Sequence, residues 1–164
     1  MENSRFNHHL RMTPCLLSRS LHLQLNHHRH HARIWGDDDW PRLFMLHGWM
    51  DHSATFQFLA EAFTRRYQII APDWRGFGGS DWNSGSYYSP DYLADLDALL
   101  AQARARGSTL IASLHAVELA LDRFPRIIGL REGRVQFDCP ATAVTPAMLA
   151  ELYAGEQEAL PCIG

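Results

Sequence analysis

The chain has 164 residues, enough for one compact domain with a buried core, and its 46% hydrophobic content excludes an intrinsically disordered chain. A formal net charge of -3 leaves no basic footprint for nucleic acid, so no nucleic-acid partner is expected. All 15 basic residues are arginine, which excludes a Schiff-base lysine and a phosphate-binding lysine.

The sequence also bears on the location of the protein. No apolar run approaches the length of a membrane span, and the N-terminal residues lack the apolar core of a signal peptide. We therefore expect a cytoplasmic protein. Cys15, Cys139 and Cys162 are widely spaced and odd in number, which favours reduced thiols over a disulfide framework or a zinc site.

Hydrophobic periodicity predicts strands in the first part of the chain. Residues 1–20 show no periodicity and are expected to form a loose arm. Residues 21–25 alternate apolar and polar like a half-buried strand, and residues 30–34 are the expected hairpin partner. Short apolar runs at residues 42–46 and 67–71 indicate buried strands.

Two helices are expected in the same part of the chain. Ser53 is the expected N-cap of the first helix. One helical face of this helix carries its apolar residues, Phe56, Leu59, Ala62 and Phe63. Residues 73–85 are rich in glycine and are expected to form a loop. Ser89 as cap and Pro90 in the first turn begin the second helix, which Gly107 can end. Its apolar face comprises Leu93, Leu96, Leu99, Leu100 and Ala103.

The rest of the chain continues the alternation. The expected elements are a strand at 109–114, a helix at 116–124 stopped by Pro125, strands at 126–130 and 134–137 around Glu132-Gly133, and a helix from Thr145-Pro146 to near Gly155. Alternating strands and helices predict an α/β layer structure with a largely parallel sheet. The strands at 42–46, 67–71 and 109–114 are expected to share that sheet.

Two motifs stand at a suggestive spacing in the first part of the chain. Residues 43–49 run from an apolar strand into His47-Gly48-Trp49, and residues 69–81 read Ile-Ile-Ala-Pro-Asp-Trp-Arg-Gly-Phe-Gly-Gly-Ser-Asp. Together they resemble the α/β-hydrolase family over residues of about 20–100. The resemblance implies that the Trp49 backbone N–H is an oxyanion-hole donor and that His47 is structural.

The hydrolase chemistry itself is not matched. The family places its nucleophile in G-x-S-x-G, followed in the chain by an acid and then a histidine. No such motif is present, and residues 78–82 come nearest but fail at the last position. No histidine follows His115, so the family's late catalytic base is also missing.

A second resemblance covers residues of about 104–158. Residues 107–121 read as a strand, His115 and a helix, and residues 126–138 add a strand, a glycine turn and a further strand. This order resembles the end of an ABC-transporter ATPase domain of the phosphonate-importer type. The resemblance places His115 at the switch histidine, which contacts the γ-phosphate of ATP in that family. The phosphate loop G-x-x-x-x-G-K-[ST] is absent, and a histidine that caps a strand end is the alternative for His115.

A run of histidines at residues 27–31 offers imidazole groups of the kind that bind transition metals. No Asp, Glu or Cys beside them completes a site, which favours an exposed polar strand or turn. We therefore expect no metal and no cofactor.

The sequence thus predicts an incomplete α/β fold with a hydrolase-like three-layer start. Three segments are expected: an arm at 1–20, a hydrolase-like segment at 21–103 and an ATPase-tail segment at 104–164. His115 is expected at the elbow where a hydrolase nucleophile stands. The favoured function is a hydrolase-like protein without a competent site, whose small-molecule partner is unknown. The alternatives are a remnant of a phosphonate-importer ATP-binding subunit, with transporter subunits as partners, and a weak esterase with an unrecognised nucleophile.

Overall fold

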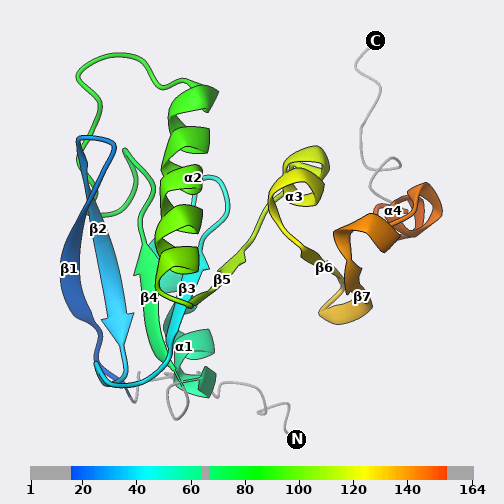
Figure 1. Ribbon diagram of the computed structural model, residues 1–164, viewed down its shortest axis with the longest axis horizontal. Coiled ribbons are helices and arrows are strands. Elements are labelled where there is room, and N and C mark those ends of the chain that lie inside the picture. The colour runs from blue at the N-terminus through cyan, green and yellow to red at the C-terminus, as the bar shows by residue number, and fades with distance from the viewer. Residues whose placement is uncertain (1–15, 64–66, 155–164) are drawn as a thin grey trace, which may run out of the picture. The chain divides into compact units, whose positions relative to one another are not determined.

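The computed structural model describes residues 16–63 and 67–154, and these divide after Ser113 into two compact units (Figure 1). Residues 16–113 form the N-terminal unit and residues 114–154 the C-terminal unit. Most of the expected arm, together with Cys15 and Cys162, lies outside the described residues. Cys139 is a free thiol. No helix in the described ranges is long and apolar enough to cross a membrane.

A five-stranded sheet is the centre of the N-terminal unit. Its strands lie in the order β1-β2-β4-β3-β5. Their bounds are β1 Arg19–Leu25, β2 His28–Trp35, β3 Arg42–Leu46, β4 Gln68–Pro72 and β5 Thr109–Ala112. β3 pairs in parallel with both β4 and β5, which confirms that these three strands share one sheet. β1 and β2 form an antiparallel hairpin, and β2 pairs antiparallel with β4, so the sheet as a whole is mixed.

Continuous apolar runs explain the middle of this sheet. All five residues of β4 and the last four of β3 are buried, as expected for parallel strands that are covered on both faces. In the β1–β2 hairpin, burial alternates along β2, whereas β1 is mostly exposed. The turn places Asn26 and His27 at positive φ (45° and 63°), a backbone region that asparagine tolerates.

Helices cover both faces of the sheet. α1 (Gln57–Phe63), preceded by the short helix η1 (Ser53–Phe56), places Ala60 in a core cluster with Leu43, Met45 and Ile69. α2 (Ser89–Ala105) places Ala103 in the other cluster, which includes Phe44, Ile70 and Ala32. Because Leu43 and Phe44 are neighbours on one strand, the two clusters lie on opposite faces. The N-terminal unit is therefore the three-layer structure that the sequence predicts.

Details of these helices differ from the prediction. His52 rather than Ser53 is the N-cap of η1, and its Nδ1 accepts a hydrogen bond from the Ala54 N–H (3.2 Å). The Ser53 N–H donates instead to Asp73. Tyr88, which makes no side-chain cap bond, stands at the cap of α2 in place of Ser89. In both cases the N-cap is the residue directly before the predicted serine, and the serine itself lies in the first turn of the helix.

The apolar face of α1 was also predicted incorrectly. Leu59 and Ala62 are exposed, whereas Ala60 is fully buried. Phe56, Ala60 and Phe63 follow the i, i+4, i+7 spacing of a single helical face, and this is the face that packs on the sheet. On α2 the predicted face holds, and Leu96, Leu99, Leu100 and Ala103 are buried.

The C-terminal unit consists of short elements around a hairpin. Its elements are α3 Val117–Arg123, β6 Arg126–Arg131, β7 Arg134–Pro140, η2 Ala141–Ala143 and α4 Pro146–Leu152. The predicted hairpin is confirmed, with Glu132 and Gly133 at φ 51° and 72° as a two-residue turn requires. Thr145 caps α4 as predicted. Gly129 is the one buried residue among residues 114–154, so this unit has no apolar core of its own in the described part of the chain.

Candidate functional site

The turn after β3 carries the predicted oxyanion donor. Trp49 follows Gly48 in this turn, and the residue is 61% exposed. The indole lies edge-on to the rings of Phe77 and Tyr92, with centroids 5.3 Å and 5.0 Å away. No acceptor within residues 16–63 and 67–154 pairs with the Trp49 backbone N–H. The backbone N–H is therefore unpaired within this part of the chain, and its role as an oxyanion donor stays a prediction.

His47 stands beneath this turn and is fully engaged with the backbone. Its Nδ1–H donates to the Gly48 carbonyl (2.8 Å), and its Nε2 accepts from the Trp74 N–H (3.2 Å). The Trp74 indole N–H donates back to the His47 carbonyl (2.9 Å). Burial lowers the pKa of His47, which keeps the ring neutral. Such a ring fixes the turn and has no free nitrogen with which to act as a base.

Asp73, at the end of β4, holds the neighbouring loops together. Its carboxylate accepts hydrogen bonds from the Ser53 N–H (2.5 Å), the Gly79 N–H (3.0 Å) and His31 Nδ1 (2.7 Å). Burial raises the pKa of Asp73, but these three donors outweigh it and hold the pKa below its usual value. The side chain is therefore an ionised structural anchor.

Ser80 is the serine nearest to a G-x-S-x-G pattern, and the structure assigns its hydroxyl to the same anchor. Its Oγ donates to the Asp73 carbonyl (2.7 Å) and accepts from the His31 N–H (3.0 Å). The side chain is buried and its one hydroxyl proton is already donated to a backbone carbonyl, which is a structural arrangement.

A buried ion pair joins the loop after β4 to α2. Arg75 donates two hydrogen bonds to the Asp95 carboxylate, both at 2.7 Å, and Asn26 adds a third at 3.1 Å. Burial raises the pKa of Asp95, yet His30, whose Nε2 lies 3.4 Å from the carboxylate, and the hydrogen bonds from Arg75 and Asn26 lower it to about 2. No motif marks this pair in the sequence, because Asp95 lies within the apolar stripe of α2 and its partners are distant in the chain.

β5 brings a further side chain to the turn after β3. The pairing Leu46↔Ala112 continues with a hydrogen bond from the Ser113 N–H to the Leu46 carbonyl (3.0 Å). A Cβ added at Gly48 would lie 3.7 Å from Ser113 Oγ, so the hydroxyl faces this turn. Ser113 is exposed. Ser113 was not predicted as a site residue, and a hydroxyl at a strand-to-helix turn is the sequence signal that could have marked it.

His115 lies in the bend between β5 and α3 and is exposed. It belongs to the C-terminal unit and comes after Ser113, which is the residue that directly follows β5. Its assignments as a switch histidine and as an elbow residue therefore remain predictions.

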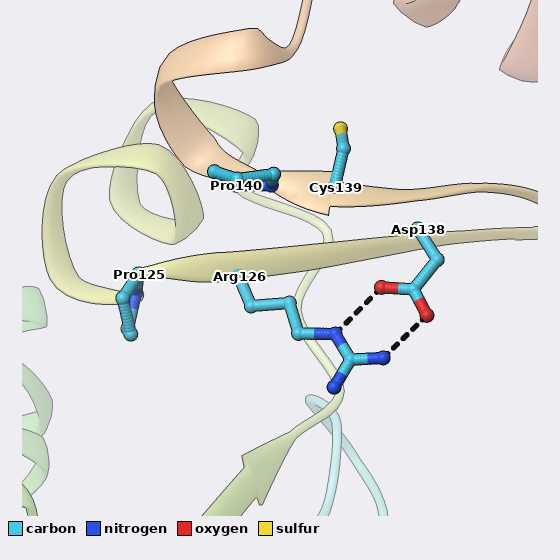
Figure 2. A pocket seen from close by; sticks show the side chains of 5 residues that line it. All are labelled: Pro125, Arg126, Asp138, Cys139 and Pro140. Atoms are coloured by element: carbon cyan, nitrogen blue, oxygen red, sulfur yellow. Dashed lines mark hydrogen bonds and ion pairs between the residues drawn. The ribbon is translucent and has the colours of Figure 1, made fainter.

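The C-terminal unit has a shallow pocket lined by Pro125, Arg126, Asp138, Cys139 and Pro140 (Figure 2). The Arg126 guanidinium pairs with the Asp138 carboxylate through two bonds of 2.6 Å and 2.5 Å. Figure 2 shows the Cys139 side chain directed away from this pair. With both charges engaged, the pocket offers no free cation to a phosphate.

Two side chains of the histidine run at residues 27–31 make structural contacts between β2 and the loop after β4. His31 bonds to Asp73, and His28 Nε2 lies 2.5 Å from the Asp81 carbonyl oxygen. No group of three or more His, Cys, Asp or Glu side chains that could hold a metal occurs in residues 16–63 and 67–154.

The sheet order, the turn after β3 and the Asp73 loop define the α/β-hydrolase fold. Residues 41–112 match the family model described as alpha/beta hydrolase fold. Two solved structures are similar to the chain. Haloalkane dehalogenase DbeA from Bradyrhizobium elkani has 26% identity and a TM-score of 0.54, over 65% of this chain and 38% of its own. Epoxide Hydrolase A from Mycobacterium thermoresistibile has 22% identity and a TM-score of 0.53, over 65% and 34%, and shows the fold alone.

The C-terminal part is similar to a different family. The phosphonates import ATP-binding protein PhnC of Pseudomonas entomophila is 63% identical over 73 residues, which are 43% of this chain and 28% of that protein. PhnC of Pseudomonas putida is 63% identical over 71 residues, which are 42% and 26%. The chain therefore joins an α/β-hydrolase-like part to a part similar to the importer ATPase. It spans 28% and 26% of the length of the two importer ATPases, and 38% and 34% of the two hydrolase structures.

Proposed function

We propose that this protein is an α/β-hydrolase-fold protein without catalytic turnover, and that it resides in the cytoplasm. One observation carries the proposal: β5, the strand beside the turn that bears Trp49, leads into Ser113 and His115 instead of a G-x-S-x-G elbow. The histidine beneath the turn, His47, has both ring nitrogens engaged, and so supports no alternative base. A small molecule that contacts the exposed Trp49 is the partner class that fits this surface.

We expect no esterase turnover. Loss of triad members costs orders of magnitude in rate even where the oxyanion hole survives. With p-nitrophenyl acetate in large excess, nitrophenolate release at steady state should match that of a solution without protein. Continuous release that disappears in Ser80→Ala, with an unchanged melting temperature, would instead support the weak-esterase alternative.

The second candidate function is that of an ATP-binding remnant of a phosphonate importer, and the identity to PhnC is the observation that favours it. Under this candidate, transporter subunits are the partners and His115 contacts the γ-phosphate. The absence of lysine and of a phosphate loop weighs against it, because a single imidazole does not replace an amide cradle.

We accordingly expect no tight binding of ATP. Isothermal titration with Mg-ATP should give no saturable heat at millimolar nucleotide, for the parent chain and for His115→Ala alike. A micromolar affinity that His115→Ala abolishes would contradict this expectation and establish the importer-remnant function.

A further inference from the structure

We propose that Ser20 is an activated nucleophile, which takes one phosphonyl group from a donor with an anionic leaving group and retains it as an ester. The site lies on the β1–β2 hairpin and not at the turn after β3, so it goes beyond the function proposed above. No sequence motif marks Ser20. The inference rests on three side chains that the hairpin and the end of β4 bring together.

The first observation is the order of the hydrogen bonds. Ser20 Oγ lies 3.1 Å from His31 Nε2, and His31 Nδ1 lies 2.7 Å from Asp73 Oδ2. The three residues come from β1, from β2 and from the position directly after β4. A hydroxyl, an imidazole and a carboxylate in this order activate a serine, and such a set is recognised by its geometry and not by its place in the chain.

The second observation is that Asp73 determines which ring nitrogen of His31 is the base. Although burial raises the pKa of Asp73, its hydrogen bonds hold that pKa below the usual value, so the carboxylate is ionised and only accepts. His31 Nδ1 therefore carries the proton of this hydrogen bond. In the neutral ring, Nε2 is then the acceptor, and it receives the Ser20 hydroxyl proton. Asp73 is thus a positioning residue.

The exposure of the three residues suits a nucleophile held by a rigid base. The side chain of Asp73 is 2% exposed and that of His31 is 13% exposed, whereas Ser20 is exposed. The His31 N–H also donates to Ser80 Oγ (3.0 Å), which fixes the backbone below the ring. The base is therefore held in place by the protein, and the hydroxyl is open to an electrophile from solvent.

Arg33 supplies a positive charge beside the nucleophile. It is directly opposite Ser20 in the β1–β2 register, so the two side chains are on one face of the hairpin. Its Nη1 donates to the Oγ of Ser18, the residue before β1 (2.9 Å). The guanidinium therefore lies near the start of the strand that carries Ser20, where it stabilises the negative charge that develops on phosphonyl oxygens.

The backbone N–H of Ser20 is a second donor at this site. The His31 N–H is bound by Ser80 and so faces away from β1, which makes His22↔His31 a pair without hydrogen bonds between the strands. Because such pairs alternate with bonded ones, the pair Ser20↔Arg33 makes none either. β1 is the first strand of the sheet, so the Ser20 N–H points to an open edge.

The reaction with a fluorophosphonate balances with these groups. Ser20 Oγ attacks phosphorus, and a P–O bond forms while the hydroxyl proton passes to His31 Nε2. The P–F bond breaks, and its electron pair leaves with fluoride. The imidazolium then releases its proton to solvent. The ester is retained because the serine alkoxide, unlike fluoride, does not leave without a proton donor.

The test is labelling with an alkyl fluorophosphonate, followed by peptide mapping. Cleavage after arginine releases residues 20–29, in which Ser20 is the one hydroxyl side chain, so a label on a hydroxyl of this peptide is assigned without ambiguity. We expect one phosphonyl group on Ser20, formed at least a hundredfold faster than on the exposed Ser84, because a positioned base contributes about 10²–10⁴-fold. Ser20→Ala should remove this label and leave the rest of the map unchanged.

Two histidine variants separate the base from its surroundings. His22 lies edge-on to His31, with ring centroids 5.7 Å apart, and is the matched control. His31→Gln should slow the labelling of Ser20 at least a hundredfold, whereas His22→Gln should leave the rate within about twofold. The melting temperature of both variants is measured alongside. Nitrogen NMR of the neutral His31 ring in the parent chain should show the proton on Nδ1.

Three results would overturn the proposal: labelling of Ser20 no faster than that of Ser84, an unchanged rate in a folded His31→Gln, or a neutral His31 ring with its proton on Nε2. If His31→Gln does not fold, the comparison with Ser84 and the NMR result decide in the parent chain. Release of more than one equivalent of nitrophenolate from p-nitrophenyl acetate, lost in Ser20→Ala, would support the site and refute only the proposed absence of turnover.

Discussion

Replacing Asp95 with alanine is expected to lower the free energy of unfolding by about 3–5 kcal/mol, the usual cost of removing one partner of a buried ion pair. The Arg75 side chain is 9% exposed and that of Asp95 is fully buried. Without Asp95, the guanidinium keeps, among the described residues, the Asp91 carboxylate at 3.6 Å, and its charge stays buried. A urea titration followed by circular dichroism would measure the loss as a lower midpoint.

Two comparisons separate burial from charge in this experiment. Asp38 pairs with Arg19 at 2.6 Å on the surface, so Asp38→Ala should cause a clearly smaller loss. The double variant Arg75→Met with Asp95→Leu should recover much of the stability, because apolar side chains of similar volume often replace a buried pair without cost. An unchanged midpoint for Asp95→Ala would show that the pair is not a stabilising element.

The sequence predicted elements whose pattern is local. Continuous apolar runs located β3 and β4, and Glu132-Gly133 located the β6–β7 turn, because each signal depends on a few adjacent residues. The N-caps and the buried face of α1 were missed. Ser53 resembles a cap by type, yet its N–H is bound by Asp73, which lies 20 residues further along the chain. Such long-range contacts leave no periodic trace in the sequence.

The candidate site shows the same contrast between residues marked by a local motif and residues placed by long-range contacts. The turn with Trp49 was identified because a motif marks it; Trp49 is exposed there, and its role as an oxyanion donor stays a prediction. Ser113 has no motif, and only the pairing of β5 with β3 places it beside Gly48. Strand order is a tertiary property, so the neighbour of a strand is read from the structure and not from the flanking residues.

The amide hydrogens of residues 114–154 are expected to exchange orders of magnitude faster than those of β3 and β4. Exchange through local opening follows the free energy of that opening, which is small where few apolar side chains are buried. Among these residues only Gly129 is buried, and an isolated two-stranded hairpin is marginally stable at best in water. By contrast, β3 and β4 lie between two apolar clusters.

Hydrogen exchange followed by mass spectrometry would resolve these regions in one experiment, with α2 as the internal reference. The junction expected from the sequence, residues 101–107, falls largely in the last turns of α2, where Ala103 is packed in the core. We therefore expect protection to persist through Ala103 and to fall beyond Ser113. Slow and uniform exchange from residue 101 to residue 154, with a single sharp melting transition, would contradict this expectation. It would mean that residues 114–154 are stabilised by more than the contacts among their own short elements.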